Sequence, residues 1–208
     1  MDIWGVIAEE RTSLLDTFEG LTGEQWEVPS LCGSWTVRQV LAHLTLAMDP
    51  PMGRYGAAVA KALGSFDKAN DRLAREEAER PIDELLARYR ERIPKRFAVP
   101  GLGPAAPLSD ILLHSLDVRI PLGISTAPPP ERYEATMELL LTRRAQQGFV
   151  PKRRPSLRWV ATDHPWSGGA GPEVEGTMAD LALAASGRAA RLDALGGPGQ
   201  RALSLWLL

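Results

Sequence analysis

The sequence predicts a mainly α-helical fold with a small C-terminal α/β region. Across most of the first two thirds of the chain, apolar residues recur at helical spacings, the pattern of helices that bury one face. Residues 157–162 instead alternate between apolar and polar side chains, which is typical of a strand. We therefore expect a helical body at residues 1–147 and a small α/β region at residues 148–208.

Two helices in the N-terminal part have ends that the sequence marks. Residues 3–21 carry a helical apolar pattern, and Gly23 follows it closely. Thr36 is followed three residues later by Gln39, a capping-box pattern that predicts the start of a second helix. Pro50 ends this helix, because a proline ring does not fit into a helix interior.

The chain between these helices and residue 147 also has a helical pattern. Residues 52–80 are rich in alanine and charged residues, and Gly64 is expected to bend or divide this stretch. Pro81 suits the first turn of the next helix. A nearly all-apolar helix is expected at residues 108–120, and another helix at residues 131–147.

The C-terminal region combines strand and helix patterns. After the strand at residues 157–162, residues 164–169 have the composition of a turn-rich loop. A second short strand is expected around Val174, followed by an apolar helix at residues 178–185. These elements predict a two-strand ribbon with a helix.

Composition excludes several classes of protein. The chain has 24 basic and 26 acidic residues, a balance that favours neither nucleic acid nor an anionic membrane as a partner. Cys32 is the single cysteine, which excludes an internal disulfide and a cysteine-rich zinc module. There is no signal-peptide pattern, and no apolar run approaches the roughly 20 residues that span a bilayer. We expect a soluble cytoplasmic protein.

Three separated residues form a candidate metal site: His43, Asp110 and His114. Asp110 and His114 are four residues apart, so a helix places them on one face, one turn apart. The alternative is a carboxylate that hydrogen-bonds an imidazole, with His43 as an ordinary core or surface histidine. The apolar helix favours the metal, because a buried ionised Asp needs a strong partner. Three protein ligands leave one coordination position open, as in catalytic sites.

Two polar residues follow on the same predicted helix. Asp117 lies about one turn beyond His114 and is a candidate to orient it by a hydrogen bond, with an exposed helix position as the alternative. Arg119 is a candidate to bind a substrate carboxylate, with an ordinary ion pair or a solvated helix end as the alternative.

Other residues that chemistry often uses have simpler interpretations here. Cys32 has no base near it in the sequence, so a small buried side chain is favoured over a nucleophile. His164 precedes a proline and is expected to shape a loop. Trp26 and Trp35 are expected to pack at the end of the helical body rather than to line a ligand site.

Three segments together resemble a known family. Residues 26–44 read WEVPSLCGSWTVRQVLAHL and contain His43, residues 110–123 contain Asp110 and His114, and residues 159–176 give a weaker match. They are similar to segments of the mycothiol-dependent maleylpyruvate isomerase family, part of the DinB-like superfamily.

The resemblance implies a DinB-like four-helix bundle that holds a divalent metal, commonly zinc, and uses the sugar thiol mycothiol as a cofactor. The implied ligands are His43, Asp110 and His114. The family pattern has Glu at the acidic position, and Asp110 is one methylene shorter. Either the helix lies closer to the ion, or the site prefers another metal such as nickel, or it binds metal more weakly.

The leading functional hypothesis is a metal- and mycothiol-dependent isomerase or S-transferase. A thiol bound at the open coordination position of the cation, or held nearby, loses its proton more easily because the cation stabilises the thiolate, and this thiolate attacks a small electrophile. The expected partners are this small-molecule electrophile and a low-molecular-weight thiol. The alternatives are a non-catalytic metal-binding sensor or interaction protein of the same fold, and a metal-dependent hydrolase that activates water.

Overall fold

The computed structural model describes residues 2–147, 149–150 and 153–208. The chain forms two compact units, Met1–Ser125 and Thr126–Leu208. The sequence predicts a boundary after residue 147. The boundary between the two compact units lies earlier in the chain, because α7 (Glu134–Leu140) packs against α8 (Met178–Ala185) within the second unit. None of the described helices has the length and apolar character needed to cross a membrane.

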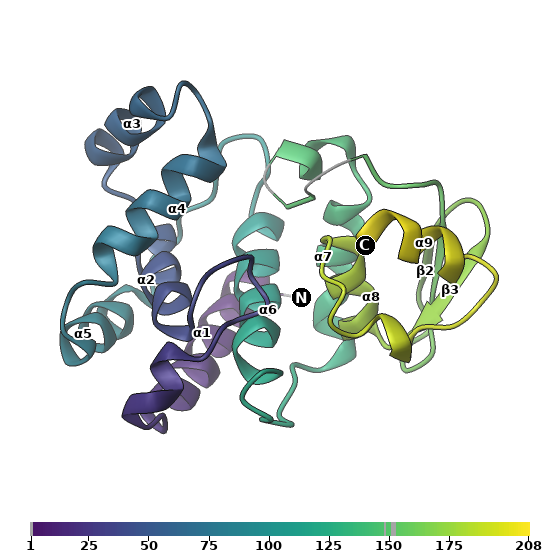
Figure 1. Cartoon of the computed structure of the whole chain (residues 1–208), viewed down its shortest axis with the longest axis horizontal. Helices are drawn as coiled ribbons and strands as arrows, with labels where there is room; N and C mark the ends of the chain where they lie inside the picture. The colour runs from purple at the N-terminus through teal and green to yellow at the C-terminus, as the bar shows by residue number, and fades with distance from the viewer. Residues whose placement is uncertain (1, 148, 151–152) are drawn as a thin grey trace. The chain divides into compact units, whose positions relative to one another are not determined.

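The first unit contains a four-helix bundle. Its helices are α1 (Ile3–Glu19), α2 (Val37–Met48), α3 (Met52–Lys61), α4 (Phe66–Glu77), α5 (Ile82–Arg92) and α6 (Ala105–Arg119), with a short 3-10 helix at Gly23–Glu27. Helix α6 packs against α1 and α2, and α5 packs against the same two helices, which closes a ring of four (Figure 1). Outside the ring, α4 lies against α2, and α3 lies against α4. The expected bundle is confirmed.

Helix α2 begins where the sequence predicts. The backbone N–H of Thr36 donates to Oε1 of Gln39 at 3.0 Å, and the reciprocal bond of the capping box is also present. These bonds satisfy donors that every helix start leaves without an internal partner. The cap therefore fixes the first turn of α2, and with it the direction in which His43 points.

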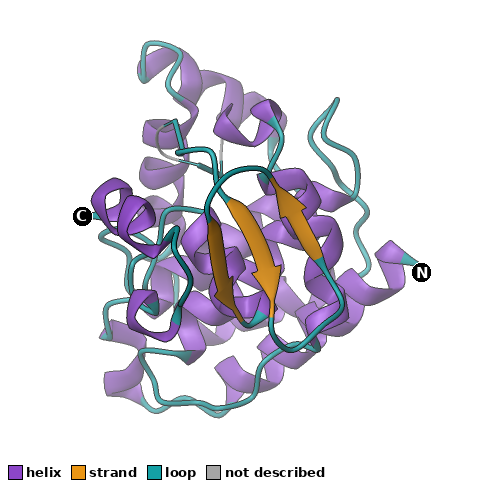
Figure 2. Cartoon of the chain, turned by 90° about the vertical axis from the view of Figure 1, so that its right-hand side faces the viewer, coloured by secondary structure: helices purple, strands orange, loops and turns teal. Residues whose placement is uncertain are grey.

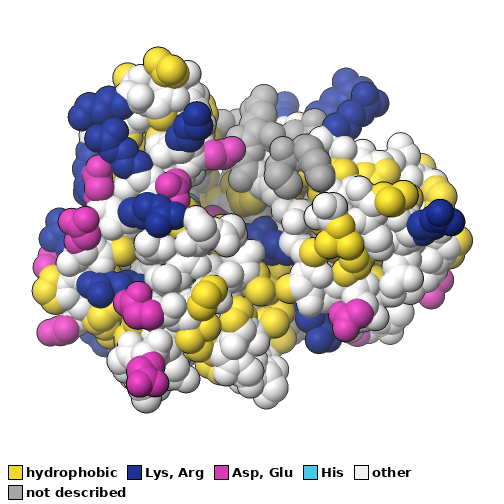
Figure 3. All heavy atoms as spheres, in the orientation of Figure 1, with side chains coloured by type: hydrophobic (Ala, Val, Ile, Leu, Met, Phe, Trp, Pro, Cys, Tyr) yellow, Lys and Arg dark blue, Asp and Glu magenta, His cyan; other side chains and the backbone are white. Residues whose placement is uncertain are grey.

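The stretch after α2 is divided at Gly64, as expected. Leu63 and Gly64 both have positive φ angles, 53° and 85°, and between them they separate α3 from α4. A small apolar cluster joins the two helices to α2 through Leu46, Ala58, Ala69 and Leu73. Acidic and basic side chains are interspersed over α4 and α5 (Figure 3), whereas the charged residues of α3 are all basic.

The second unit contains a three-stranded sheet with the strand order β2-β1-β3 (Figure 2). The central strand pairs antiparallel with one neighbour and parallel with the other. The second unit consists of 3-10 helices at Pro130–Tyr133, Arg143–Gln147 and Leu192–Ala194, helices α7, α8 and α9 (Gln200–Leu207), and strands β1 (Arg158–Ala161), β2 (Ser167–Gly169) and β3 (Glu173–Gly176). Helix α8 packs against α7 and on both β1 and β3.

Two predictions for this unit are wrong in detail, and one helix was not predicted. The sheet has a third strand, β2, in a segment whose glycines predict a loop, because pairing with β1 outweighs low strand propensity. The helix expected at residues 131–147 is interrupted after Leu140. Helix α9 has no counterpart in the sequence prediction, whereas α8 has the bounds that the sequence predicts.

Candidate metal centre

The structure brings together the three residues expected to bind metal. His43 lies on α2, and Asp110 and His114 lie on the neighbouring helix α6. Oδ1 of Asp110 is 3.3 Å from Nε2 of His43 and 3.5 Å from Nε2 of His114. All three potential ligand atoms lie within 4.8 Å of one another.

The two separations from Asp110 fit a tetrahedral metal site. With metal–ligand distances of about 2.0–2.2 Å, two ligand atoms of a tetrahedral zinc site are about 3.4 Å apart. The observed separations of 3.3 and 3.5 Å match this spacing and exceed the roughly 2.7–2.9 Å of a strong charge-assisted hydrogen bond. Asp110 reaches both rings despite its short side chain. This favours the explanation that the helix carrying Asp110 lies close enough to the ion to compensate for the shorter side chain.

The electrostatics of the cluster keep a negative charge on Asp110. Burial raises the pKa of this carboxyl group, but the facing rings of His43 and His114 outweigh burial and hold the pKa well below its usual range. Burial lowers the pKa of His114, and hydrogen bonds to Asp110 and Asp117 outweigh this and raise it well above its usual value. A cation that binds Nε2 of His114 must therefore displace a proton.

Asp117 holds the ring of His114 from the other side. Nδ1 of His114 lies 2.9 Å from Oδ2 of Asp117, whose side chain is fully buried. Once the ring has lost the proton on Nε2, the Nδ1–H group still donates this hydrogen bond, and the lone pair of Nε2 is left free on the side that faces Asp110. Carboxylates in this position fix the tautomer and orientation of metal-binding histidines. The expected orienting contact is present.

Replacing Asp117 with Asn is expected to weaken zinc affinity by about 10- to 100-fold. An amide can turn its NH₂ group toward Nδ1, which places the proton on Nε2 and blocks the ligand atom. Competition with a chromophoric chelator measures the change. Asp83→Asn, an exposed carboxylate on α5, is the matched control and should leave the affinity unchanged. An unchanged affinity in Asp117→Asn would contradict the orienting role.

Arg119 is buried between α6 and α1. Its guanidinium donates to the backbone oxygen of Ser13 at 2.9 Å, to Oγ1 of Thr17 at 3.0 Å and to Oγ of Ser115 at 2.8 Å. These bonds tie two helices of the bundle together, which is a structural role. The expected role of Arg119 in binding a substrate carboxylate stays a prediction.

Trp35 lies against the histidine pair, where the sequence predicts only packing at the end of the bundle. Its ring centroid is 5.0 Å from that of His43 and 6.1 Å from that of His114. Its indole N–H donates to Oδ1 of Asp71 on α4 at 2.8 Å. The one sequence signal for this role is position, since Trp35 directly precedes the cap of the helix that carries His43.

We expect zinc binding to change the fluorescence of Trp35, because the ion displaces a proton from the adjacent imidazole pair. The change should disappear in Trp35→Phe, which keeps an aromatic ring. This variant also loses the hydrogen bond to Asp71, at a cost of about 0.5–1.5 kcal/mol. Trp166→Phe, in the second unit, is the control that should preserve the response. A full response in Trp35→Phe would show that another tryptophan reports the ion.

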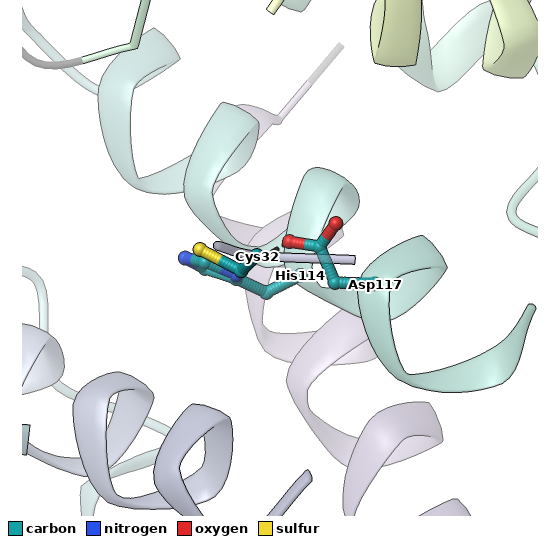
Figure 4. A group of neighbouring side chains, drawn as sticks. All are labelled: Cys32, His114 and Asp117. Atoms are coloured by element: carbon teal, nitrogen blue, oxygen red, sulfur yellow. Dashed lines mark hydrogen bonds and ion pairs between the residues drawn. The ribbon is translucent and has the colours of Figure 1, made fainter. Parts of the chain in front are cut away.

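Cys32 is the second residue whose position the sequence does not predict. Cys32, His114 and Asp117 each offer one potential ligand atom, and these three atoms lie within 4.8 Å of one another. Figure 4 shows the three side chains. The backbone N–H of Leu31 donates to the carbonyl oxygen of Asp117 at 3.1 Å, which brings this loop onto α6. The thiol group is therefore a second neighbour of His114, and the two candidate clusters share this histidine. His164, in contrast, lies in the second unit and pairs with Glu134.

Comparisons with known proteins identify the family and the fold of the chain. The family model for the mycothiol maleylpyruvate isomerase N-terminal domain matches residues 7–111, a range that includes His43 and Asp110. No curated protein matches the chain. A crystal structure of the mycothiol-dependent maleylpyruvate isomerase matches with a TM-score of 0.64 and 12% identity, covering 96% of this chain and 92% of the other. A histidine-to-alanine mutant of that enzyme matches with the same TM-score and coverage, at 11% identity.

At this level of identity the structural likeness establishes the fold alone. The family model supports a stronger conclusion, membership of the family, because it matches half of the chain, including most of the bundle. The chain therefore belongs to the family of the mycothiol maleylpyruvate isomerase N-terminal domain.

Proposed function

We propose that this chain is a metal-dependent enzyme that uses mycothiol, acting as an isomerase or S-transferase on a small electrophile. The observation that carries the proposal is the cluster of His43, Asp110 and His114, whose ligand atoms lie within 4.8 Å of one another on two packed helices. The family and the fold support a mycothiol-dependent reaction in particular.

The residues of the site would have different roles in this reaction. His43, Asp110 and His114 would hold the ion, and two imidazoles with one carboxylate are a ligand set that zinc accepts and that nickel or iron also tolerates. The bound ion would supply a positive charge that stabilises the thiolate of the cofactor. Asp117 would keep Nε2 of His114 available, and Trp35 would cover the imidazole pair on one side.

Activity assays with and without thiol test the proposal. Zinc-loaded protein is incubated with mycothiol and a cis-configured unsaturated dicarboxylic acid, and both isomerisation and S-adduct formation are followed. We expect turnover that needs the thiol and is lost in His43→Ala. His164→Ala, which removes a histidine in the second unit, is the matched control and should retain activity.

The other outcomes point to other functions. A metal-loaded protein that is inert with a panel of thiols and electrophiles would contradict the enzyme and support a metal-binding sensor or interaction protein. Turnover of ester or amide substrates without any thiol would contradict the thiol chemistry and support a hydrolase.

A further inference from the structure

The proposed function assigns no role to Cys32, although its thiol group lies beside a candidate metal ligand. Cys32, His114 and Asp117 each offer one potential ligand atom, and these atoms lie within 4.8 Å of one another (Figure 4). Thiolate, imidazole and carboxylate groups are all ligands of metal ions in proteins. This second cluster is therefore a candidate metal site beside the first cluster, which consists of His43, Asp110 and His114.

Backbone hydrogen bonds hold Cys32 against α6. The N–H group of Cys32 donates to Oγ of Ser30 at 3.1 Å, and its carbonyl oxygen accepts from the N–H group of Trp35 at 3.1 Å. The neighbouring N–H group of Leu31 donates to the carbonyl oxygen of Asp117 at 3.1 Å. The fold thus fixes the position of Cys32 in advance, so little backbone order has to be gained when a ligand binds.

The second cluster is buried on one side and accessible on the other. The side chain of Asp117 is fully buried and that of His114 is 8% exposed, whereas Cys32 is only partly buried. The side with the thiol group is therefore the route by which an ion can reach the buried ligands. A cation is a favourable partner there, because a buried carboxylate is costly without compensation of its charge.

Sulfur distinguishes the second cluster from the first one. A thiolate favours soft cations, whereas the first cluster offers imidazoles and a carboxylate and lacks sulfur. With bond lengths of about 2.3 Å to sulfur and 2.0–2.1 Å to nitrogen, the two ligand atoms of a tetrahedral site are about 3.6 Å apart. Ligand atoms within 4.8 Å of one another reach such a spacing with small side-chain movements, and a larger soft ion has longer bonds.

His114 belongs to both clusters, and its ring can serve only one of them at a time. A neutral imidazole has one nitrogen with a lone pair and one that carries the proton. In the first site, Nε2 would bind the ion while Nδ1–H donates to Asp117 at 2.9 Å. In the second site, Nδ1 would bind the ion, and the proton would be on Nε2, which faces Oδ1 of Asp110 at 3.5 Å. Each tautomer thus has a carboxylate beside its protonated nitrogen.

We propose that Cys32, Nδ1 of His114 and Asp117 form a second metal site, which takes a soft, thiol-binding cation and thereby excludes the first ion. The binding of the soft cation does not depend on the proposed function. The exclusion does rest on it, because it requires that the first ion binds Nε2 of His114. A soft cation is then an inhibitor that acts by displacing the first metal ion.

Titration with cadmium tests the site, because this ion is soft and does not oxidise thiols. Metal-free, full-length protein is titrated with cadmium chloride, with a phosphine as the reductant, and the ultraviolet charge-transfer band of the cadmium–thiolate bond is recorded. Cys32 is the single cysteine of the chain, so the band reports this residue alone. We expect a saturable band that is absent in Cys32→Ser and retained in His43→Ala.

Substitutions of the other two ligands distinguish a metal site from an isolated thiol. His114→Gln and Asp117→Asn should each weaken cadmium affinity at least about tenfold, because loss of even an orienting partner costs about 10- to 100-fold. Asp83→Asn, which changes an exposed carboxylate on α5, is the matched control and should leave the affinity unchanged. Circular dichroism establishes which variants fold, and Asp117→Asn decides the question if His114→Gln does not fold.

A second measurement tests the exclusion. Cadmium is added to zinc-loaded protein, and elemental analysis after gel filtration counts both metals. We expect cadmium to replace zinc in the wild type, and much less so in Cys32→Ser. Zinc that stays bound while the charge-transfer band forms would refute the exclusion. A protein that binds no zinc but shows the band would contradict the proposed function and support the second site.

Three results would overturn the second site. These are the absence of a charge-transfer band, unchanged cadmium affinity in folded His114→Gln and Asp117→Asn proteins, and loss of the band in a folded His43→Ala protein. The second result would leave an isolated thiol as the binding group. The third would place cadmium in the first site.

Discussion

Replacing His114 with alanine is expected to remove the metal and to abolish thiol-dependent turnover. His114 offers Nε2 to the ion and is the one residue shared by the two candidate clusters, with His43 and Asp110 on one side and Cys32 and Asp117 on the other. Loss of an orienting partner alone costs about 10- to 100-fold in metal affinity, so loss of the ligand itself should cost roughly 100-fold or more. Elemental analysis of the purified protein and chelator competition measure this effect.

Two further variants distinguish the clusters. If the ion binds to His43, Asp110 and His114, His43→Ala should lose metal while Cys32→Ser keeps it. If the ion binds to Cys32, His114 and Asp117, the result is the reverse. His164→Ala controls for the loss of a histidine elsewhere, and circular dichroism confirms that each variant is folded. Full metal retention in a folded His114→Ala protein would exclude both clusters.

The helices that carry this site could be predicted because their signals are local. A capping box spans only Thr36 to Gln39, and the pair Asp110 and His114 needs only the period of one helix. The break at Gly64 is local as well, since it depends on a positive φ that glycine adopts without strain. The meeting of His43 with Asp110 is not local. It could be predicted because these side chains are of types that bind one metal ion together, and because the family resemblance implies the same three ligands.

The environment of the site could not be predicted, because it depends on contacts between residues far apart in the sequence. Trp35 contacts the rings of His43 and His114, and Asp71, its partner on α4, is 36 residues away. Cys32 meets His114 only because its loop is hydrogen-bonded to α6. No periodicity or spacing in the sequence indicates these neighbours, so both residues look like ordinary packing groups.

The sheet of the second unit shows the same limitation. Strand β2 contains two glycines, and local propensity argues against a strand there. A Cβ at Gly168 would lie 2.9 Å from the ring of Trp166 and 3.0 Å from Leu141, so the glycine is required by packing rather than by a turn. That requirement is visible only when the neighbours are in place.

Replacing Glu77 with Gln is expected to destabilise the first unit by roughly 2–3 kcal/mol, and the reason is an arginine cluster around one buried carboxylate. Glu77 is 1% exposed at the C-terminal end of α4, where the helix dipole disfavours a negative charge. Its oxygens lie 3.1 Å from Arg54 on α3, 2.9 Å from Arg80 and 3.2 Å from Arg88 on α5. The carboxylate thus joins three helices.

The size of the expected destabilisation depends on the three arginine charges that remain when the carboxylate is removed. Breaking a fully buried ion pair costs about 3–5 kcal/mol, because the remaining charge has no partner. The three arginine side chains are 30–38% exposed, so water compensates part of their charge and the expected cost is lower. Urea unfolding measures the total, and hydrogen exchange should show faster opening of α3 and α4 than of α1 and α6.

Glu76→Gln is the matched control for this prediction. Glu76 is the adjacent residue, is 43% exposed and pairs with Arg54 and Arg72 on the surface. Exposed pairs contribute about 0–1 kcal/mol, so this variant should change stability little. Equal effects of the two variants would mean that burial of Glu77 adds nothing. A larger effect of Glu77→Gln, together with faster exchange in α3 and α4, would show that this carboxylate holds the outer helices against the bundle. The same carboxylate would then keep Asp71, on α4, beside Trp35.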